Sequence, residues 1–594
     1  MAEQVLDKIR SVGVVGCGTM GAGIAEIVAR NGIEVRFVDV DEVAVEAGYE
    51  RIRGSLERQV QRERIDGDER DAILGRIEGS AGWEILSTCD LIVEAVPEVL
   101  ELKQRAFSRI DEHARPDAII ATNTSSLPVM DIAVHTTRPN RVLGFHFFNP
   151  APVMKLIELV RTVITDESVV ETAREFAESI GKVPVVVGDR RGFIANQLLF
   201  PYLNQAVWMV EGGYATKDDI DAAMRFGAGL PMGPIALTDL VGVDTFVGIM
   251  DAIHSQFEDT RFAPRPILGQ LAAAAFTGRK SGRGFYRYEA PGSSRTLADA
   301  DTRPAPDPAS IAGWTSVGVL GTGTMASGIA EVCAKAGFEV VVRGRSRDKA
   351  EAVLARVAKS LQRMVDKGRV TGEDMVATLG RIRPTIDLED LADCDLVIEA
   401  VAEDLDVKRE LFGALAPILK PDALLTTTTS SLPVVTCAMA TDRPEKVIGL
   451  HFFNPAAIMK LVEIVTTVRT DPDVVEQARA FVERIGKVGV LCGDRAGFIV
   501  NTLLFPYLND AVKMLESHYA TAEEIDTAMK LGCGYPMGPF ELMDVVGLDI
   551  TLAIMERLRD EYRQPSYEAA PLLRHLVDAG FLGRKAGRGF YVYT

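Results

Sequence analysis

The sequence lacks the features of a secreted, membrane-spanning or zinc-binding protein. No hydrophobic run among its 594 residues approaches the ~20 residues that cross a bilayer. The opening stretch, MAEQVLDKIR, lacks the basic-then-apolar pattern of a secretory signal. The seven cysteines show neither CxxC nor any other paired spacing. We therefore expect reduced thiols, no metal site, and a cytoplasmic protein without a membrane partner.

Basic residues are also in deficit. The chain has 65 Lys and Arg residues against 84 Asp and Glu, which gives a net charge of −19 and a pI near 5.0. This balance argues against a nucleic-acid partner. A composition of 47% hydrophobic and 25% charged residues is typical of a globular chain with large cores. The length suggests about four domains of ~150 residues each.

Histidine is scarce, and its positions point to an internal repeat. Adding 305 to a residue number in the first half of the chain gives the counterpart in the second half, as for Gly16 and Gly321. Of the seven histidines, only His146 and His451 correspond in this way. A repeat of this length indicates a duplicated gene rather than a solenoid. A stretch rich in Pro, Ala and Asp separates the copies and has the composition of a linker.

Each copy begins with alternating strand and helix signals and ends with helical signals alone. Short apolar strands spaced by helical segments predict a mainly parallel sheet up to about residue 190 of the first copy. We therefore predict an α/β Rossmann-type domain followed by an all-α domain, the pair being duplicated in tandem. The predicted bounds are 1–190 and 191–288 for the first copy, 289–312 for the linker, and 313–495 and 496–594 for the second copy.

The start of the first copy carries a nucleotide-binding pattern. In SVGVVGCGTMGAGIAEIVARNGIEVRFVDV, an apolar strand precedes the GxGxxG glycines Gly16, Gly18 and Gly21, and a helical segment follows them. These glycines permit a tight turn, the approach of a pyrophosphate to backbone amides, and close packing of helix on strand. Asp39 ends the second strand at the spacing expected for a ribose contact. We therefore predict NAD in the first half, with Thr19 and Met20 completing the turn.

The second copy departs from this pattern. Its turn has Gly321, Gly323 and Ala326, and Gly344 replaces the acid. The surrounding VRGRSRDK adds three arginines, among which Arg345 is the nearest candidate for a 2′-phosphate contact. We hypothesise that the second half prefers NADP or binds NAD poorly. The alternative is drift in a unit that no longer turns over.

One histidine and one glutamate recur twelve residues apart in each copy. HFFNPAPVMKLIE contains His146 and Glu158, and HFFNPAAIMKLVE contains His451 and Glu463. Two apolar strands joined by a short turn would bring each pair together. A carboxylate beside an imidazole fixes one tautomer and stabilises the ring after it accepts a proton, which suits a general base. The structural alternative is a buried pair whose two side chains only hydrogen-bond each other. The recurrence of the pair beside a nucleotide motif favours a catalytic role.

With these motifs in place, each copy resembles a complete L-3-hydroxyacyl-CoA dehydrogenase, of the 3-hydroxybutyryl-CoA dehydrogenase family. The motifs in the first copy are GCGTMGAGIA, EAVPE, NTSSLP, GFHFFNPAPVMKLIE, GFIANQLL, PMGP and GRKSGRGFY. They cover nearly all of both copies apart from the linker. The resemblance implies reversible NAD(P)-dependent oxidation of an L-3-hydroxyacyl-CoA to a 3-ketoacyl-CoA, in a cleft between the two domains of each copy.

The resemblance also implies residue roles. His146 matches the catalytic base and Glu158 its partner, while Ser125 and Asn196 match residues that hold the reacting end of the substrate. Their counterparts in the second copy are Ser430, His451, Glu463 and Asn501. The implied cofactor contacts are Glu98, Lys103, Asn149 and Lys280, with the counterparts Glu403, Lys408, Asn454 and Lys585. The implied CoA contacts are Ser55 and Arg62, matched by Ser360 and Lys367.

Three alternatives stay open at this point. The first is a CoA-independent hydroxy-acid or sugar-acid dehydrogenase of the same fold, similar to relatives of lambda-crystallin. The second is a non-catalytic second half that binds nucleotide or serves as a structural module, since Thr428 also replaces Asn123 there. The third is a nicotinamide-responsive interaction protein. Family members commonly pair through the helical domain, so we expect an intrachain pseudo-dimer of the two halves, with a further homo-oligomer left open.

Overall fold

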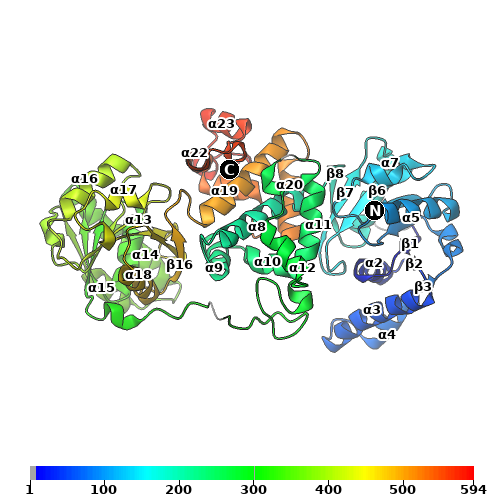
Figure 1. The fold of residues 1–594 in the computed structure, drawn as a ribbon, viewed down its shortest axis with the longest axis horizontal. Coiled ribbons are helices and arrows are strands. Elements are labelled where there is room, and N and C mark those ends of the chain that lie inside the picture. The colour runs from blue at the N-terminus through cyan, green and yellow to red at the C-terminus, as the bar shows by residue number, and fades with distance from the viewer. Residues whose placement is uncertain (1–8, 258, 300–301, 594) are drawn as a thin grey trace.

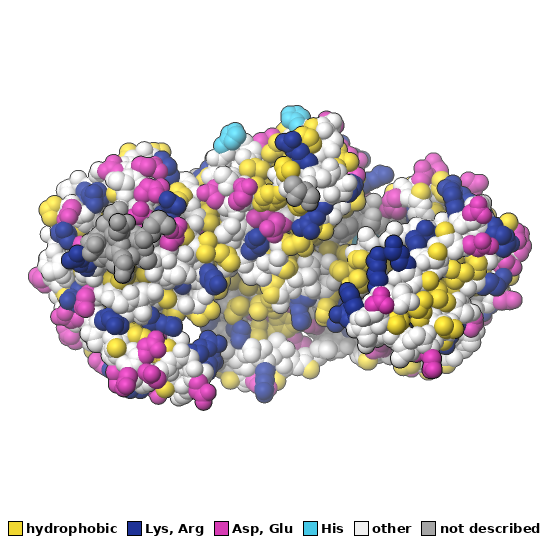
Figure 2. Space-filling view, turned by 180° about the vertical axis from the view of Figure 1, so that it is seen from behind, with side chains coloured by type: hydrophobic (Ala, Val, Ile, Leu, Met, Phe, Trp, Pro, Cys, Tyr) yellow, Lys and Arg dark blue, Asp and Glu magenta, His cyan; other side chains and the backbone are white. Residues whose placement is uncertain are grey.

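The computed structural model describes residues 9–257, 259–299 and 302–593. Residues 1–8, most of the opening stretch MAEQVLDKIR, therefore lie outside the described residues. So do 258, 300–301 and 594, which fall within the predicted domain and linker bounds. Two α/β domains form the ends of an elongated molecule, and the helices of both halves lie between them (Figure 1). On the face drawn in Figure 2, Lys and Arg side chains are interspersed with Asp and Glu over both ends.

Each α/β domain is built on one eight-stranded sheet. The first runs in the order β3-β2-β1-β4-β5-β6-β7-β8, and the second in the matching order β11-β10-β9-β12-β13-β14-β15-β16. The strands of the first sheet are β1 (Ser11–Val15), β2 (Glu34–Val38), β3 (Ile77–Ser80), β4 (Leu91–Glu94), β5 (Ile119–Thr122), β6 (Val142–Phe147), β7 (Leu156–Arg161) and β8 (Val183–Gly188). Those of the second are β9 (Ser316–Leu320), β10 (Glu339–Arg343), β11 (Ile382–Thr385), β12 (Leu396–Glu399), β13 (Leu424–Thr427), β14 (Val447–Phe452), β15 (Leu461–Thr466) and β16 (Val488–Gly493).

Neighbouring strands are parallel except at one place in each sheet. The β6–β7 and β14–β15 pairs are antiparallel because only a short connection joins their strands. The central strands are buried on both faces, and all six residues of β6 are buried. This explains their near-continuous apolar sequence, since parallel sheets are covered by helices on both sides. The covering helices of the first sheet are α2 (Thr19–Arg30), α3 (Glu42–Gln61), α4 (Gly67–Leu74), α5 (Leu100–His113), α6 (Val129–Ala133) and α7 (Glu167–Ser179).

The second half repeats this arrangement and its helical domain. Around the second sheet lie α13 (Thr324–Lys335), α14 (Arg347–Asp366), α15 (Gly372–Gly380), α16 (Leu405–Leu415), α17 (Val434–Ala438) and α18 (Pro472–Arg484). The first helical domain contains α8 (Ala195–Glu211), α9 (Lys217–Gly227), α10 (Pro234–Val241), α11 (Val243–His254) and α12 (Pro266–Ala273). The second contains α19 (Val500–Glu516), α20 (Ala522–Cys533), α21 (Pro539–Val546), α22 (Leu548–Tyr562) and α23 (Pro571–Asp578). The predicted fold class is confirmed.

The two helical domains pack against each other within the chain. Helix α8 lies on α19, where the rings of Tyr202 and Tyr507 are 6.2 Å apart between centroids. The amide of Gln205 donates to the Tyr567 hydroxyl at 2.8 Å. Buried side chains of both domains belong to one continuous hydrophobic cluster. The centre of the molecule is therefore a single apolar core to which both halves contribute.

Each helical domain also covers the edge of the other half's sheet. Helix α9 packs on β15 and β16, and α20 packs on β7 and β8. The Tyr214 hydroxyl donates to the Gly493 carbonyl at 2.9 Å, and Tyr519 donates to Gly188 at 2.7 Å. Since β8 and β16 are edge strands, these contacts protect strands that would otherwise be open to pairing.

The predicted linker is held along much of its described length. Lys217 bonds Asp299, and Arg303 pairs with Asp219 at 3.1 Å. Further on, a short helical turn (Pro308–Ile311) packs on α18. All seven cysteine thiols are free, and six are buried. Among the described residues, no helix combines the length and the apolar character that a membrane crossing requires.

Candidate active site

The glycine turn after β1 has the shape that a dinucleotide needs. Gly16 has a φ of +89°, a conformation that favours glycine, and a Cβ on Gly21 would lie 1.8 Å from the Gly16 carbonyl oxygen. A Cβ on Gly18 would meet nothing within 4 Å, so the turn is open above this residue. Gly18 immediately precedes α2, whose first backbone amides are free for an anion. These residues fit the pyrophosphate of a dinucleotide.

Asp39 lies beside this turn. Its carboxylate accepts from the Cys17 amide at 2.7 Å and from the Val40 amide at 2.8 Å. Sequence reasoning missed Arg51, whose guanidinium donates to the Cys17 carbonyl at 3.2 Å from helix α3. Its counterpart Arg356 bonds the Thr322 carbonyl in the same way, so recurrence in both halves was the available signal. The acid is thus held at the end of β2, where a ribose contact would need it.

The corresponding corner of the second half has no carboxylate. Gly321 has a φ of +125°, against +89° for Gly16, and the opened turn accommodates the buried methyl of Ala326. A Cβ on Gly344 would come 2.9 Å from the Ala350 amide nitrogen, so this position has no room for a side chain without movement. Arg345 is exposed in the loop between β10 and α14. This corner therefore lacks the carboxylate that Asp39 supplies in the first half, and its loop carries an exposed arginine.

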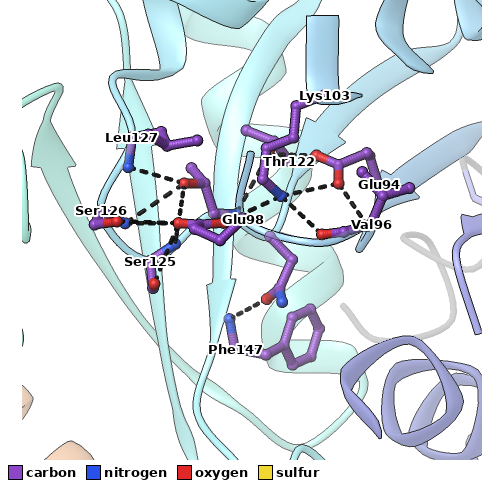
Figure 3. Close-up of polar contacts among 11 residues, drawn as sticks. Glu94, Val96, Glu98, Lys103, Thr122, Ser125, Ser126, Leu127 and Phe147 are labelled. Atoms are coloured by element: carbon purple, nitrogen blue, oxygen red, sulfur yellow. Dashed lines mark hydrogen bonds and ion pairs between the residues drawn. The ribbon is translucent and has the colours of Figure 1, made fainter. Parts of the chain in front are cut away.

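A buried lysine links two glutamates below the nucleotide edge (Figure 3). Lys103 is 1% exposed, and its ammonium contacts Glu94 at 2.9 Å, Glu98 at 3.2 Å and the Val96 carbonyl at 3.3 Å. Three donors thus meet three acceptors. Lys408 repeats the pairing with Glu399 and Glu403, and it is also 1% exposed. The expected contact of Lys103 and Lys408 with the cofactor stays a prediction.

Glu98 gathers the loop after β5. One carboxylate oxygen accepts from the Thr124 hydroxyl at 2.7 Å and the Ser125 amide at 2.8 Å (Figure 3). Burial alone would raise the pKa of Glu98, but the Lys103 charge and these hydrogen bonds outweigh burial and lower it. Glu403 repeats the arrangement with Lys408, Thr429 and Ser430, and its pKa is also lowered. Glu98 and Glu403 are thus anionic at neutral pH.

The completely buried Glu94 and Glu399 were missed as part of this network. Glu94 receives the Thr122 hydroxyl at 2.7 Å, the Val96 amide at 2.6 Å and the ammonium of Lys103. A buried carboxylate is costly unless it is paired and hydrogen-bonded. The glutamate that opens EAVPE and EAVAE at matching positions in the two halves was the signal that could have found it.

The histidine–glutamate pairs form as predicted. The antiparallel register places His146 opposite Glu158 on β6 and β7, and the imidazole Nδ1 lies 2.7 Å from the carboxylate. In the second half, His451 and Glu463 face each other in the same register at 2.6 Å. Both glutamates are completely buried, and the histidine side chains are 7% and 8% exposed. Residues directly opposite each other across this pair lie on one face of the sheet, close enough for their side chains to interact.

The second oxygen of Glu158 anchors the helical domain. It accepts from the amides of Ile194 and Ala195, both at 3.0 Å, at the start of α8. Glu463 does the same with Ile499 and Val500. A carboxylate engaged on both oxygens cannot rotate away from the imidazole. The other ring nitrogen, Nε2, makes no hydrogen bond to the residues that the structure describes.

Ser125 and Asn196 meet beside this pair in the first half. The Asn196 amide donates to the Ser125 carbonyl at 3.1 Å, which connects α8 to the loop after β5. The Ser125 hydroxyl is 3.2 Å from Glu98. Asn123 accepts from the Phe147 amide at 2.9 Å and so joins the ends of β5 and β6 (Figure 3). Sequence reasoning missed Phe148, whose ring packs 4.6 Å from the His146 ring.

Several predicted contacts are not joined to this cluster. Lys280 pairs with Asp244 at 2.7 Å, and Lys585 pairs with Asp549 at 2.6 Å, all within the helical domains. Their contact with a nucleotide stays a prediction. The same holds for Asn149 and Asn454, which are exposed in the β6–β7 and β14–β15 connections.

The predicted CoA contacts lie along one helix of each half. Ser55 is on α3, where it hydrogen-bonds Glu26 of α2. Burial raises the Glu26 pKa, and this hydrogen bond partly opposes that rise. Arg62 is exposed at the end of α3. Their counterparts Ser360 and Lys367 lie in and directly after α14. No interaction within the chain tests a role in CoA binding, which stays a prediction.

One open cavity lies away from both histidines. It has a volume of about 780 Å³ between α9 and β16, and Tyr214, Arg303 and Arg495 are among its lining residues. Arg303 is already paired with Asp219, and Arg495 lies over the Tyr214 ring. Hydrogen-bonding geometry therefore locates the candidate site better than cavity size does.

Comparison with known proteins gives a consistent result. The NAD-binding domain of 3-hydroxyacyl-CoA dehydrogenases matches residues 11–190 and 316–495, and the C-terminal domain matches 192–288 and 497–593. A 3-hydroxybutyryl-CoA dehydrogenase of Mycobacterium tuberculosis is 46% identical over 284 residues, covering 48% of this chain and 99% of the relative. The mouse mitochondrial hydroxyacyl-coenzyme A dehydrogenase is 42% identical over 288 residues, covering 47% and 92%.

One solved structure aligns with both halves together. It is a 3-hydroxybutyryl-CoA dehydrogenase from Escherichia coli K12, with 26% identity, a TM-score of 0.70, and coverage of 96% of this chain and 99% of its own. The alignment with this structure thus extends over nearly the full length of both chains. The chain belongs to the 3-hydroxyacyl-CoA dehydrogenase family and carries both domains of that family twice.

Proposed function

We propose that each half of the chain catalyses the reversible oxidation of an L-3-hydroxyacyl-CoA to a 3-ketoacyl-CoA, with His146 and His451 as the general bases. Membership of the family makes the chain an NAD-dependent oxidoreductase. The observation that carries the residue assignment is the doubly anchored Glu158, which holds the His146 Nδ1 and leaves Nε2 without a partner among the described residues. Glu463 and His451 repeat it.

The chain's own groups account for the proton. Glu158 accepts the Nδ1–H, so the neutral ring presents an unprotonated Nε2 that takes the proton of the substrate hydroxyl. The buried carboxylate then stabilises the resulting imidazolium. Ser125 and Asn196, linked at 3.1 Å, hold the reacting end of the substrate. A bound nicotinamide supplies the hydride acceptor.

The two halves differ in the proposed cofactor. Asp39 beside the first glycine turn supports NAD there. The second half offers Gly344 and the exposed Arg345, which support NADP or a weaker use of NAD. Glu98, Glu403 and the glycine turns complete the proposed cofactor sites, and Ser55, Arg62, Ser360 and Lys367 remain the proposed CoA contacts.

The proposed organisation follows from the same contacts. Domain bounds of 1–190, 191–288, 313–495 and 496–594 agree with the change from sheet to helix between Gly188 and Ala195 and between Gly493 and Val500. The packing of α8 on α19 supports an intrachain pseudo-dimer.

The test is a steady-state assay that measures the turnover of each half separately. Reduction of a panel of 3-ketoacyl-CoAs is followed with NADH and NADPH in the chain as it stands and in the His146→Ala, His451→Ala and doubly substituted chains. Each single substitution should abolish one component of the turnover, and the double substitution should abolish both. Undiminished turnover in the double variant would refute the assignment. Equal rates with the free keto acids would favour the CoA-independent alternative. A His146→Ala chain without turnover would show that the second half is non-catalytic.

A further inference from the structure

The ring that packs on His146 is itself held by the other half of the chain. Phe148 lies 4.6 Å from the His146 ring, centroid to centroid, and is half-buried. Gly532, in the last turn of α20, lies next to this ring. A Cβ built on Gly532 would be 3.1 Å from the Phe148 ring and 2.8 Å from Leu156. Leu156 is on β7, two residues before Glu158. Gly532 is thus in contact with Phe148, which packs on His146, and with Leu156, which is on the same strand as Glu158.

The same contact occurs in the opposite direction. In the second half, the Phe453 ring lies 4.6 Å from the His451 ring. A Cβ on Gly227, at the end of α9, would be 2.6 Å from Leu461 and 2.9 Å from Val500, and 3.5 Å from the Phe453 ring, which is an ordinary van der Waals contact. The Val500 amide is one of the two that hold Glu463. Two copies with separate sequences have therefore kept a glycine at the point where each helix meets the other half's site.

Other contacts confirm how close α20 lies to the first-half site. Burial, followed by the charge of Glu158, raises the pKa of the neighbouring Cys533 thiol to about 12. Burial and Glu158 also raise the pKa of Tyr519, whose hydroxyl donates to Gly188 at the end of β8. In Figure 1, α20 lies beside β7 and β8, although more than 300 residues separate them in the sequence. The contact is thus one edge of a continuous interface.

We infer that each helical domain positions the catalytic histidine of the other half. Gly532 sets the place of Phe148 beside His146, and Gly227 sets the place of Leu461 and Val500, and through Val500 that of Glu463, the partner of His451. This inference rests on the proposed function. Protein interiors are close-packed, so a side chain at either glycine must move the ring or the strand beside it. Both glycines are therefore positioning residues. Gly532 acts through Phe148 and Leu156, and Gly227 acts through Leu461 and Val500. A displacement of about 1 Å near the reacting atoms can lower turnover ~100-fold.

The test uses full-length chains in which only one half turns over. Gly532→Val, made in the His451→Ala chain, should lower the kcat of first-half turnover about 10- to 100-fold while the KM for NADH stays near its original value. Made in the His146→Ala chain, the same substitution should leave second-half turnover unchanged, although Gly532 belongs to the second half. Gly227→Val should give the reverse pattern.

Controls separate positioning from folding. Gly248→Ala in α11 adds a methyl where a Cβ meets nothing within 4 Å and where the second half already has Ala553, so it should leave both activities unchanged. If the Gly532→Val chain fails to fold, Gly532→Ala replaces it. Because alanine has a higher helix propensity than glycine, a loss of turnover in this variant cannot come from a weakened helix. Phe148→Leu combined with Gly532→Val should be no slower than Phe148→Leu alone, because the two changes act through one contact.

The outcomes distinguish two failures. If the histidine variants do not remove turnover, the proposed function fails. If they do, but Gly532→Val impairs the second half or leaves first-half turnover intact, the positioning across halves is wrong while the proposed function stands.

Discussion

The carboxylate of Glu158 is shared between an imidazole and a helix. One oxygen faces His146 Nδ1 at 2.7 Å, and the other receives two amides at the start of α8. A single residue therefore orients the candidate base and fixes the helical domain next to it. This dual use explains why the chain has a glutamate at both Glu158 and Glu463, each with none of its surface exposed.

Glu158→Gln tests the orienting role. The glutamine retains an oxygen and an amide but turns a donor toward the imidazole or the α8 amides, so the ring loses its fixed tautomer. In the His451→Ala chain we expect kcat to fall by about 10²- to 10⁴-fold, with NADH binding unchanged. Stopped-flow binding and steady-state rates check this. A loss confined to KM would show that the pair is structural.

Arg345 tests the cofactor difference. Arg345→Ser, made in the His146→Ala chain, should weaken NADPH about 10-fold by removing a charge-assisted contact and should change NADH little. Arg559→Ser is the matched control, because Arg559 is exposed and pairs only with Asp560 among the ion pairs that the structure describes. Cofactor titrations followed by nicotinamide fluorescence give both constants. An unchanged NADPH affinity would contradict the role of Arg345.

At the scale of elements, a buried aspartate holds the start of α10. Asp221 accepts from the amides of Ile235 and Ala236 at 2.7 and 2.9 Å and from the Tyr286 hydroxyl at 2.9 Å. A Cβ on Gly233 would lie 2.3 Å from Asp221. This contact explains the PMGP motif, in which a glycine must precede the proline that opens the helix. Asp526 and Gly538 repeat it.

Gly233→Ala should therefore destabilise the first helical domain. The added methyl would displace Asp221 and its hydrogen bonds, at a cost of about 1–3 kcal/mol in the free energy of unfolding. Urea denaturation followed by circular dichroism measures the shift. Gly269→Ala in α12 is the control, since a Cβ there meets nothing within 4 Å. Equal stability of the two variants would contradict the packing argument.

The connection between β6 and β7 depends on a buried lysine. The Lys182 ammonium bonds the carbonyls of Ala151 and Met154 at 2.5 and 2.7 Å, and burial, with the nearby Arg30, lowers its pKa to about 8. Lys487 holds the equivalent loop, and its pKa is also lowered. The loop that follows His146 is thus fixed by a residue on a different strand connection.

This lysine makes stability depend on pH. The folded chain releases the Lys182 proton near pH 8 and the unfolded chain near 10.5, so the unfolded state binds more protons in between and stability rises over that interval. Relative to Lys182→Met, the unmodified chain should gain up to about 3 kcal/mol between pH 7.5 and 10. Thermal midpoints at several pH values measure this. Relative to Lys155→Met, at an exposed lysine of the same connection, the unmodified chain should show no such gain, because both chains retain Lys182.

At the scale of the molecule, the halves are joined by more than the linker. Helix α8 packs on α19, and Arg261 of the first half pairs with Asp510 of the second at 2.7 Å. One edge of each sheet, β8 or β16, is covered by the other half. The apolar surface buried at the centre belongs to both halves. Neither half could expose this surface without cost.

Co-expressed segments 1–299 and 302–594 should therefore copurify as a one-to-one complex. Light scattering and size exclusion measure this, with the intact chain of 64.4 kDa as the reference. Arg261→Ala should weaken the complex, because it leaves Asp510 without its bidentate partner. Elution of the two segments as separate, folded monomers would refute the pseudo-dimer. The cytoplasmic location and any further oligomer stay predictions.

Much of the fold and part of the site could be predicted from local pattern. Gly16, Gly18 and Gly21 follow a strand and open a helix, and the alternation that predicts β6 and β7 also brings His146 to Glu158. The burial of Lys103 between Glu94 and Glu98 could not be predicted, because a lysine in a polar motif looks the same whether it reaches solvent or a buried glutamate. Phe148 was missed because an aromatic residue beside a histidine gives no sign of what lies on its other face.

The sequence by itself determined the two copies, the succession of strands and helices, and the residue types at each candidate site, because these depend on neighbours within a few tens of residues. Only the tertiary structure decided that α9 and α20 cross to the other half's sheet and that Glu158 holds α8. Those contacts join residues as far apart as Gly188 and Tyr519, and they depend on which apolar surfaces pack together once both halves have folded.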